Sequence, residues 1–224
     1  MAAAGLDPAA VEALVVTHEH RDHFSGVGAW ARSYQVPVCV TAACRKAIAG
    51  GFVCDRLDGV VVREFQPGRA FEAGGVELYP VATSHDAADS VGFRIADGTS
   101  VLGFATDLGV ASPALIQSLQ GAGLLYLESN HDESLLLSGP YPWFLKQRIR
   151  SRRGHLSNEA CGALVSELFH AGLKAVVLGH LSEVNNRPRL AYAATRQTLR
   201  KWGAEDDVLV LVARQDRPGR VLRV

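Results

Sequence analysis

Three histidines and two carboxylates crowd into seven consecutive residues near the start of the chain. The segment THEHRDH, residues 17–23, holds three of the eight histidines in the sequence. A neutral imidazole offers a nitrogen lone pair at pH 7 without costly deprotonation, and it is the commonest transition-metal ligand. The segment follows the apolar run ALVV, so a sharp turn after a short strand can gather its side chains. The cluster predicts a metal site rather than a polar surface turn, with the ligands His18, His20, Asp22 and His23.

The pattern H-x-H-x-D-H after an apolar strand resembles the signature of the metallo-β-lactamase superfamily. Members of this superfamily bind two metals between two β-sheets flanked by helices. The resemblance implies three more ligands, each at the end of a later strand. His85 follows VELYPVATS and is the expected third ligand of the first metal, beside His18 and His20. Asp107 ends VLGFATD and is the expected bridge between the metals, because a carboxylate offers two oxygens.

The expected final ligand ends the apolar segment KAVVLGH. This residue, His180, is expected to hold the second metal together with Asp22 and His23. Considered alone, each of the three later ligands is more typical of a capping or core polar residue. Their order and their places at strand ends, after the signature, favour metal ligation.

Two further stretches narrow the resemblance. LYLESNHDESLLLSGPYPWFLKQRIRSRRGHLSNEA and VVLGHLSEVNNRP closely resemble the YycJ (WalJ) branch of the metallo-hydrolases, which is linked to double-stranded DNA exonuclease activity. A histidine and an S-x-E helix before the final metal histidine also occur in the ribonuclease Z and cyclic phosphodiesterase relatives. Phosphodiester hydrolysis is therefore the reaction that the resemblance implies.

The resemblance runs from about residue 7 to the last helices, and family members usually begin with a further N-terminal segment. That segment carries an SGSSGN-like loop, strands and an Asp that supports the metal site. Here Met1 falls just upstream of the metal loop. We expect an α/β fold, namely a metallo-β-lactamase-type αββα sandwich that lacks its N-terminal strands. A wrong start codon or a truncated chain would explain the missing strands. One N-terminally incomplete domain over residues 1–224 is expected, and its exposed sheet edge favours poor solubility or a homodimer.

The implied site holds two divalent metal ions, with zinc favoured by the imidazole-rich shell and manganese left open by the two carboxylates. Such a pair can supply a metal-bridging hydroxide and neutralise charge on a phosphoryl oxygen. Asp22 is counted among the catalytic residues as well as the ligands. His155 is the candidate that protonates the departing oxygen. Glu128 and His131 are candidates to orient it or to form a dyad, and the alternative for each is a solvated loop residue.

Five cations within eight residues predict contacts along a phosphate backbone. They are Lys146, Arg148, Arg150, Arg152 and Arg153. A solvated helix face is the alternative, but the position of the segment between Glu128 and His155 favours phosphate binding.

Two amides and two aromatic residues are further candidates for substrate contacts. Asn185 and Asn186 follow the final ligand, and they can donate to a phosphate or cap the next helix with equal reason. Tyr141 and Trp143 can stack on a base, but core packing is the commoner role and is favoured.

The elements that must position these residues alternate between strands and helices. Strands are expected at residues 13–17, 36–41, 60–65, 76–83, 90–97, 101–107, 124–129, 174–179 and 207–213. Helices are expected at residues 24–35, 112–123, 141–153, 157–170 and 190–202. The turn residues DGTS between two β-rich segments predict an antiparallel hairpin.

The composition is typical of a globular protein, with 48% hydrophobic and 21% charged residues. Lys plus Arg equals Asp plus Glu at 23 each, so DNA binding has to depend on a local patch. The four cysteines form no C-x-x-C pair, and no signal or membrane segment is evident. These features indicate a cytoplasmic protein.

We therefore predict a dinuclear metal-dependent phosphodiesterase, a DNA exonuclease acting from 5′ ends. DNA is its expected partner, and no association with a membrane is expected. The same metal loop serves hydrolases of thioesters, lactams and cyclic phosphodiesters, which stay open as alternatives. A truncated metal-binding form that has lost catalysis is the third possibility. Cleavage of duplex DNA and bis-p-nitrophenyl phosphate, against S-lactoylglutathione or nitrocefin, separates the enzyme classes.

Overall fold

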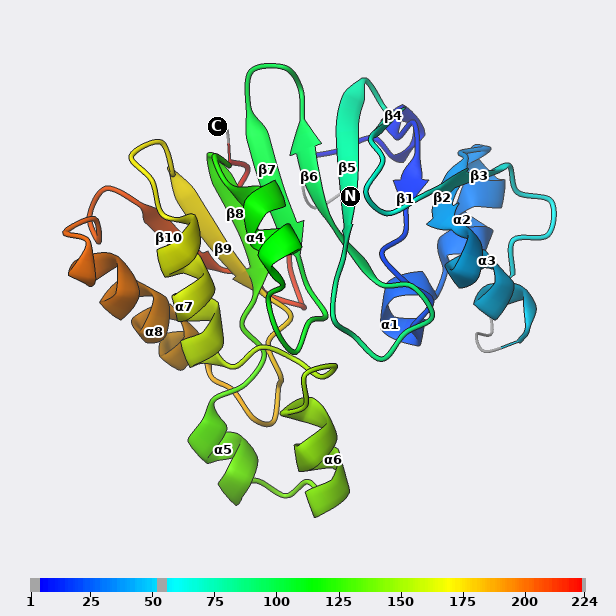
Figure 1. The fold of residues 1–224 in the computed structure, drawn as a ribbon. Coiled ribbons are helices and arrows are strands. Elements are labelled where there is room, and N and C mark those ends of the chain that lie inside the picture. Colours follow the sequence, from blue (N-terminus) through cyan, green and yellow to red (C-terminus); the bar gives the residue numbers. More distant parts are fainter. Residues whose placement is uncertain (1–4, 52–55, 223–224) are drawn as a thin grey trace.

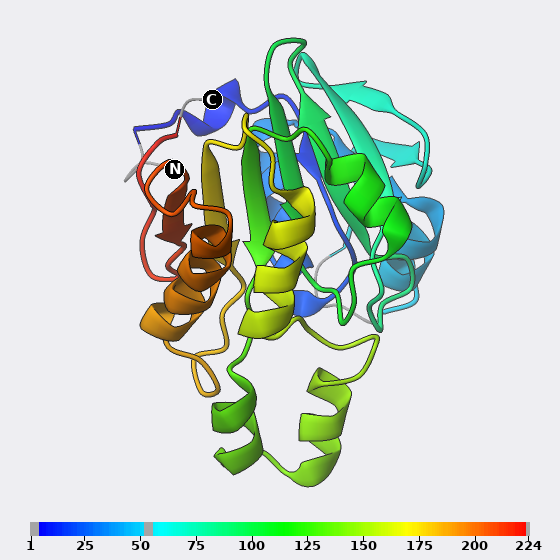
Figure 2. The same cartoon turned by 60° about the vertical axis from the view of Figure 1, so that its left-hand side comes forward.

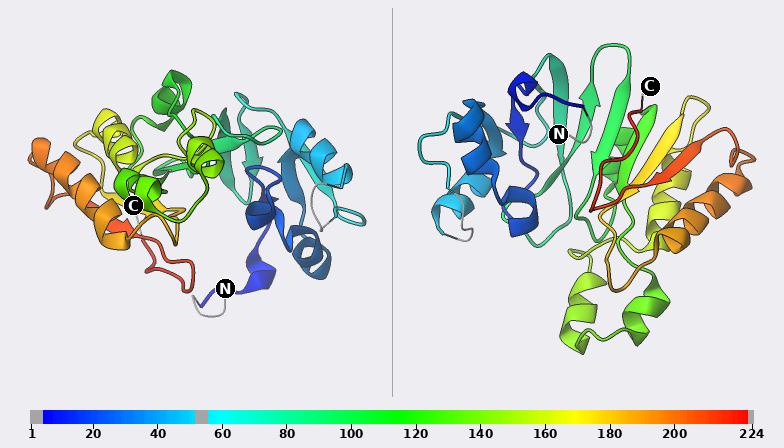
Figure 3. Two further views of the ribbon diagram at one scale, coloured as in Figure 1. Left: turned by 90° about the horizontal axis from the view of Figure 1, so that it is seen from below. Right: turned by 180° about the vertical axis from the view of Figure 1, so that it is seen from behind.

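Two β-sheets face each other and carry helices on their outer faces (Figure 1). The computed structural model describes residues 5–51 and 56–222. From below and from behind, the four layers lie in the order helix, sheet, sheet, helix, which is the αββα sandwich predicted from the sequence (Figure 3). The helices on the outer faces are α2 (Val27–Tyr34), α3 (Ala42–Ala49), α4 (Pro113–Leu119), α7 (Asn158–Leu168) and α8 (Pro188–Lys201).

The smaller sheet carries the predicted metal loop after its first strand. Its strands, all parallel, are β1 (Leu14–Val15), β2 (Val38–Thr41) and β3 (Val62–Phe65). All four residues of the central strand β2 are buried. Because successive side chains point to opposite sides of a strand, β2 is covered on both faces. Val38 and Val40 pack with the helices outside the sheet, whereas Cys39 packs between the two sheets.

The larger sheet brings the ends of several strands to one edge. Its strands, in spatial order, are β10 (Leu209–Val212), β9 (Ala175–Gly179), β8 (Leu124–Glu128), β7 (Val101–Ala105), β6 (Val91–Ala96), β5 (Val76–Ala82) and β4 (Phe71–Ala73). Strands β6 and β7 pair antiparallel, which confirms the predicted hairpin. Because β6 is antiparallel to both β5 and β7, and β8, β9 and β10 continue in parallel, five strands share one direction. Four of them, β5, β7, β8 and β9, lead into candidate site residues. Their carboxyl ends meet at one edge of the sheet.

The hydrophobic core has separate parts inside and outside the sandwich. Between the sheets, Phe65 of β3 and Phe93 of β6 belong to one cluster with Leu78 of β5. Outside the larger sheet, the fully buried Leu125 and Leu127 of β8 pack under the helices. Each such leucine contributes about 1.5–3 kcal/mol when it leaves water. The strands that end at the metal edge are therefore held by packing on both faces.

Three predicted helices differ from those observed. The helix expected at 112–123 is α4, which ends four residues early at Leu119. The helix expected at 24–35 is divided into α1 (Arg21–Phe24) and α2, because Gly26 between them has a φ of 86° that a helix does not accommodate. The helix expected at 141–153 is α6 (Trp143–Ile149) and ends four residues early.

A short helix that the sequence analysis did not predict precedes α6. This helix, α5 (Glu133–Ser138), begins after Asp132, whose side chain accepts a hydrogen bond from Leu135 N at 2.9 Å. Figures 1 and 2 show α5 and α6 projecting together from the sandwich as an arm.

The loop after α6 is fixed against the loop after β5. Ser84 Oγ donates to Arg152 O at 2.7 Å, and Arg153 Nε donates to His85 O at 3.0 Å. A Cβ at Gly109 would overlap the backbone of Arg152, so only glycine allows the close approach. Three segments distant in sequence therefore meet beside the metal edge.

Three of the four cysteines lie in the described residues, and each is buried and unpaired: Cys39, Cys44 and Cys161. Cys54 lies outside the described residues. Over residues 5–51 and 56–222, none of the helices combines the length and the apolar character needed to cross a membrane.

Replacing Gly109 with Ala is expected to lower the free energy of unfolding by about 1–3 kcal/mol, because the new methyl group must displace backbone rather than a flexible side chain. Urea unfolding followed by circular dichroism measures the change. Gly123→Ala is the control, since the nearest atom to its Cβ is Gly172 O at 3.8 Å. Equal stability of the two variants would contradict the proposed close contact.

Candidate metal centre

Four of the predicted site residues lie where neighbouring strands end. His85 follows β5, Asp107 follows β7, Glu128 is the last residue of β8, and His180 follows β9. Asp107 and His180 have positive φ values, 58° and 56°, which are rare for residues other than glycine. This conformation costs roughly 1–2 kcal/mol per residue, and it persists where the surrounding structure holds it. The sharp turns it makes direct both side chains into the same site.

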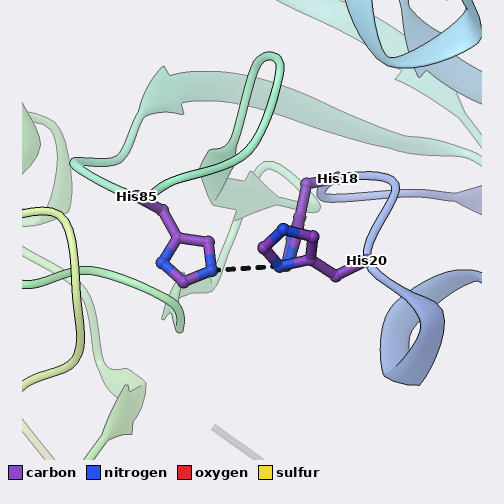
Figure 4. Close-up of side chains that lie close together, drawn as sticks. All are labelled: His18, His20 and His85. Atoms are coloured by element: carbon purple, nitrogen blue, oxygen red, sulfur yellow. Dashed lines mark hydrogen bonds between the residues drawn. The ribbon is translucent and has the colours of Figure 1, made fainter. Parts of the chain in front are cut away.

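The first group of candidate ligands consists of His18 and His20 from the loop after β1 and His85 from the loop after β5 (Figure 4). His18 Nδ1 lies 3.1 Å from Thr17 Oγ1, and His85 Nδ1 lies 3.2 Å from Gly154 O. These contacts leave Nε2 of both rings for the centre of the group. His85 Nε2 lies 3.2 Å from His20 Nδ1. Two nitrogens at ~2.1 Å from one tetrahedral zinc ion are roughly 3.4 Å apart, so one ion fits this pair.

The environment of His18 shows that the first group suits a cation. The ring is wholly buried, and its Nε2 has no hydrogen-bond partner in the part of the chain that the structure describes. Burial lowers the pKa of His18 to about 3, against a smaller raising effect of Asp107. A buried nitrogen lone pair without a partner is costly. A metal ion supplies that partner without requiring a proton.

The second group consists of Asp22, His23 and His180, whose ligand atoms lie within 4.8 Å of one another. Asp22 Oδ2 is 3.5 Å from His23 Nε2 and 3.7 Å from His180 Nε2. The structure thus brings together the two sets of residues that the sequence analysis assigned to two metals, and the sets adjoin each other, since His18 and His23 also gather with Asp107.

Asp107 lies between the two groups. Its Oδ1 is 3.4 Å from His85 Nε2 and 3.7 Å from His180 Nε2, and its Oδ2 is 3.1 Å from His23 Nε2. Burial opposes ionisation, but the neighbouring imidazoles of His23 and His180 hold the pKa of Asp107 well below its ordinary value. One ionised carboxylate therefore faces both groups, as the predicted bridging role requires.

Carboxylates hold protons on the imidazoles of the second group. Burial lowers the pKa of His23, but the contacts with Asp107 and Asp22 outweigh it and raise that pKa to about 9. Burial likewise opposes protonation of His180, yet Asp22 and Glu128 raise its pKa to about 11. A metal ion that binds here must displace these protons, because an imidazole binds a metal through a free lone pair.

The carboxylate of Glu128 is fully buried and makes four hydrogen bonds beneath the centre. Its Oε1 accepts from His155 Nδ1 at 2.8 Å and from His180 Nδ1 at 2.7 Å. Its Oε2 accepts from the backbone N–H groups of Leu108 and Leu156 at 3.1 and 3.2 Å. Burial alone raises the pKa of Glu128, but the bonds to the two imidazoles lower it below its ordinary value. Both rings are thereby fixed with Nδ1 toward Glu128.

His155 lines the cleft beside the two groups and differs from its predicted neighbour His131. The cleft, about 440 Å³, is also lined by His20 and Asp22. Burial opposes protonation of His155, but its bond with Glu128 raises its pKa, which favours the protonated ring. His131 is buried and lies 3.6 Å from Glu133 instead, so Glu128 is the residue that orients His155.

Two arginines of the basic segment are paired with carboxylates. Arg148 Nε lies 2.6 Å from Asp86 Oδ2, and Arg150 Nε lies 2.9 Å from Glu133 Oε2. The Arg152 side chain is exposed and has no ion pair within the described ranges. Arg148 also lines the cleft, so it and Arg152 are the arginines best placed for a phosphate.

The rest of the basic segment serves the fold. Lys146 is buried, and its Nζ donates to Leu137 O at 2.6 Å and Gly139 O at 2.7 Å, which does not fit the predicted phosphate contact. Arg153 donates to the backbone of His85. The sequence pattern did not reveal these contacts, because both depend on chain segments that meet only in the folded protein.

The two asparagines after His180 are interior residues. Asn186 is 2% exposed, and its Nδ2 donates to Ser129 O at 2.8 Å and Asn130 O at 3.0 Å. Its Oδ1 accepts from Arg187 N at 2.8 Å, just before α8. Asn185 is fully buried. These positions do not fit the predicted phosphate contact. The alternative role as a helix cap is not observed either, because the N-cap of α8 is Arg187 and no side chain makes a capping hydrogen bond there.

The two aromatic residues differ in exposure. Trp143 is 60% exposed, so the favoured prediction of core packing is wrong for it. Tyr141 lines the cleft that also contains His155.

Two residues that position the site were not predicted. Glu19, inside the THEHRDH segment, accepts a hydrogen bond from Ala88 N at 2.8 Å and ties the metal loop to the loop after β5. Asn130 Nδ2 donates to His180 O at 2.9 Å. The sequence signal for Glu19 was its position between two candidate ligands of the motif. The signal for Asn130 was its position two residues after the end of β8.

Two groups of imidazole and carboxylate ligands, at one edge of an αββα sandwich, define the metal-dependent hydrolases of the metallo-β-lactamase superfamily. The chain belongs to this superfamily, since the family model described as "Beta-lactamase superfamily domain" matches residues 2–181.

Among curated relatives, the chain is similar to the exodeoxyribonuclease YycJ of Bacillus anthracis. The two are 32% identical over 197 residues, which cover 86% of this chain and 72% of the relative. It is also 32% identical to the exodeoxyribonuclease WalJ of Streptococcus pneumoniae over 185 residues, covering 83% and 69% of the two chains. Its fold resembles that of the metallo-β-lactamase fold protein YhfI from Bacillus subtilis, with a TM-score of 0.69, 20% identity and coverage of 94% and 78%.

His180, at a strand end, and His155, in a loop, both bond Glu128, but the variants that lack them are expected to differ in metal content. His180→Ala should lose metal from the second group and abolish turnover. His155→Ala should retain two metals and lose about 10²- to 10⁴-fold in rate, the usual range for a general acid. Elemental analysis of the purified variants gives the metal content. Loss of a metal from His155→Ala, with both retained in His180→Ala, reverses the assignment.

Metal uptake by the metal-free protein is expected to release protons at neutral pH. Because the pKa values of His23 and His180 are raised to about 9 and 11, both rings are protonated at pH 7, and filling the second group should release about two protons. Affinity should therefore rise with pH. Calorimetric titration in buffers of different ionisation enthalpy counts the protons. Release close to zero would show that the two rings are already neutral in the metal-free protein, against the raised pKa values.

Proposed function

We propose that the protein is a dinuclear metal-dependent phosphodiesterase that degrades DNA from its ends, with cleavage starting at the 5′ end. The observation that carries the proposal is the sharing of one buried Glu128 oxygen by His180 and His155. This arrangement places a protonated imidazole beside the candidate metal ligands, at a fixed distance from them. The similarity to two exodeoxyribonucleases supports DNA as the substrate.

The ligand assignment in this proposal follows the two groups. His18, His20 and His85 would hold one ion, and Asp22, His23 and His180 would hold the other, with Asp107 shared. Two such ions supply an activated water near neutral pH and neutralise charge on a phosphoryl oxygen. The imidazole-rich first group favours zinc, whereas the carboxylates of the second group also suit manganese.

The proposed task of His155 is to protonate the departing oxygen. A 3′-oxygen leaves as a strongly basic alkoxide unless it receives a proton, and the phosphodiester therefore needs an acid in the cleft. Glu128 holds Nδ1 of His155, which leaves Nε2 for the substrate, and the same bond raises the pKa of the ring. A thioester hydrolase has less need of such a group, because a thiolate leaves readily.

The proposed task of the arginines is to hold the phosphates beside the cleavage site. Arg148 lines the cleft, but it is held by Asp86, which keeps its side chain at the rim. Arg152 extends from the loop that precedes His155. A phosphate bound by these two side chains would lie next to the imidazole of His155. A cytoplasmic location is part of the proposal, because it would give the protein access to DNA.

The proposal is tested by a panel of substrates with the metal-loaded protein. We expect degradation of blunt duplex DNA labelled at its 5′ end, release of short labelled products first, and hydrolysis of bis-p-nitrophenyl phosphate. Chelation should abolish both activities. Turnover of S-lactoylglutathione or nitrocefin without DNA degradation would assign the site to a carbonyl substrate, and release of the 3′ label first would reverse the polarity. Two bound metals with no turnover of any substrate would leave a metal-binding protein.

A further inference from the structure

The arm formed by α5 and α6 ends in apolar side chains that the fold leaves in solvent. Trp143 is 60% exposed and Phe144 72% exposed, and Leu137 at the end of α5 is 44% exposed. The arm projects from the edge of the sandwich where the candidate metal centre lies (Figures 1 and 2). Aromatic rings grouped in solvent beside an active-site cleft are typical of a binding surface.

The arm is braced, so these rings lie on a fixed platform. The buried Lys146 of α6 donates to Leu137 O and Gly139 O and thereby closes the end of α5 against α6. At the base, Arg150 pairs with Glu133 at 2.9 Å. The two ends of the arm are joined by the backbone, since Asn158 N donates to His131 O at 2.8 Å. The exposed rings therefore do not depend on packing with one another for their position.

The inner side of the arm continues into the cleft of the metal centre. Tyr141, Leu145, Arg148 and Ile149 line the same cleft as the candidate ligands. Residues 133–153 carry five cationic side chains and one carboxylate. Of the five cations, Lys146 is buried, and Arg148 and Arg150 are paired with carboxylates. Arg152 and Arg153 are exposed and have no ion pair within the described residues, so they are the cations that can complement a polyanion.

We propose that the arm binds a single-stranded stretch of nucleic acid, with bases stacked on Trp143 and Phe144 and the adjoining phosphates near the arginines. Stacking on an aromatic face requires a base that is not enclosed in a duplex. The cleft, about 440 Å³, has the size of a site for one small ligand, such as a single nucleotide unit. The inference rests on the proposed function, because it takes the strand that enters the cleft to be DNA.

The stacking contribution gives a measurable expectation. Base stacking on an aromatic side chain contributes about 1–3 kcal/mol per base, so losing two rings should weaken binding of a single strand at least about tenfold. Binding of a blunt duplex should change less, because its paired bases are not available to the rings. Affinity for both is measured by fluorescence anisotropy with labelled oligonucleotides in EDTA, so that no cleavage occurs.

The test compares the double variant Trp143→Ser, Phe144→Ser with Trp202→Ser. Trp202 is the matched control because its exposure, 55%, is close to that of Trp143 and it lies at the end of α8, outside the arm. Its Nε1 donates a hydrogen bond to Ser166 Oγ. We expect the control to bind both oligonucleotides as the unchanged protein does. Should the double variant fail to fold, Trp143→Tyr is compared with Trp143→Leu, and only the tyrosine variant should retain binding.

Several outcomes overturn the inference. Unchanged affinity for the single strand, or an equal loss for single strand and duplex, removes the stacking role. Conversion of a dimer into a monomer by the double variant, seen by sedimentation, would assign the aromatic surface to a second copy of the chain. The proposed function fails separately: a protein that binds single strands through the arm but cleaves no DNA with metal keeps the inference and loses the nuclease assignment.

Discussion

The buried carboxylate of Glu128 is the interaction on which the site depends. Burying a carboxylate costs several kcal/mol of lost hydration, and hydrogen bonds to both of its oxygens are needed to offset that cost. Here both oxygens have two donors each, two imidazoles above and two backbone N–H groups beside them. The bonds tie together the ends of β7, β8 and β9 and the loop before α7. Removing the charge would leave His155 and His180 without the partner that sets their tautomers, so chemistry and local stability share one residue.

The candidate ligands reach a common point because the four strands of the larger sheet that lead into the site run in one direction. The left-handed turns at Asp107 and His180 then direct side chains into the site that an extended strand would direct past it. The loop after α6 is bound to the loop after β5 through Ser84 and His85, which couples His155 to the first group of ligands. Strand ends carry most of the candidate ligands, whereas a loop carries His155.

Much of this arrangement could be predicted from short-range patterns. The signature at His18 to His23 depends on one loop. His85, Asp107 and His180 were predicted from the resemblance to the superfamily, with the preceding apolar strands showing which residues match it. The contacts that were missed depend on long-range packing. Lys146 belongs to a basic run, but it is buried because the end of α5 turns back onto it. The amide side chain of Asn186 could donate a hydrogen bond to a phosphate, but it donates instead to backbone carbonyls almost sixty residues earlier in the chain. The exposure of Trp143 could not be predicted either, because aromatic residues pack in cores more often than they line arms.

The closed base of the arm has a consequence for how such proteins can diverge. His131 and Ser157 pair as an isolated bridge, so the chain leaves the sandwich and returns to it at neighbouring points. Within this excursion, α5 and α6 can change in length and sequence without moving Glu128, whereas the loop that returns to α7 carries His155 and Leu156, which both bond Glu128. The boundary between a replaceable stretch and a fixed one therefore falls inside the excursion, between the end of α6 at Ile149 and His155. Exchange of α5 and α6 alone between relatives would leave the bonds of Glu128 in place.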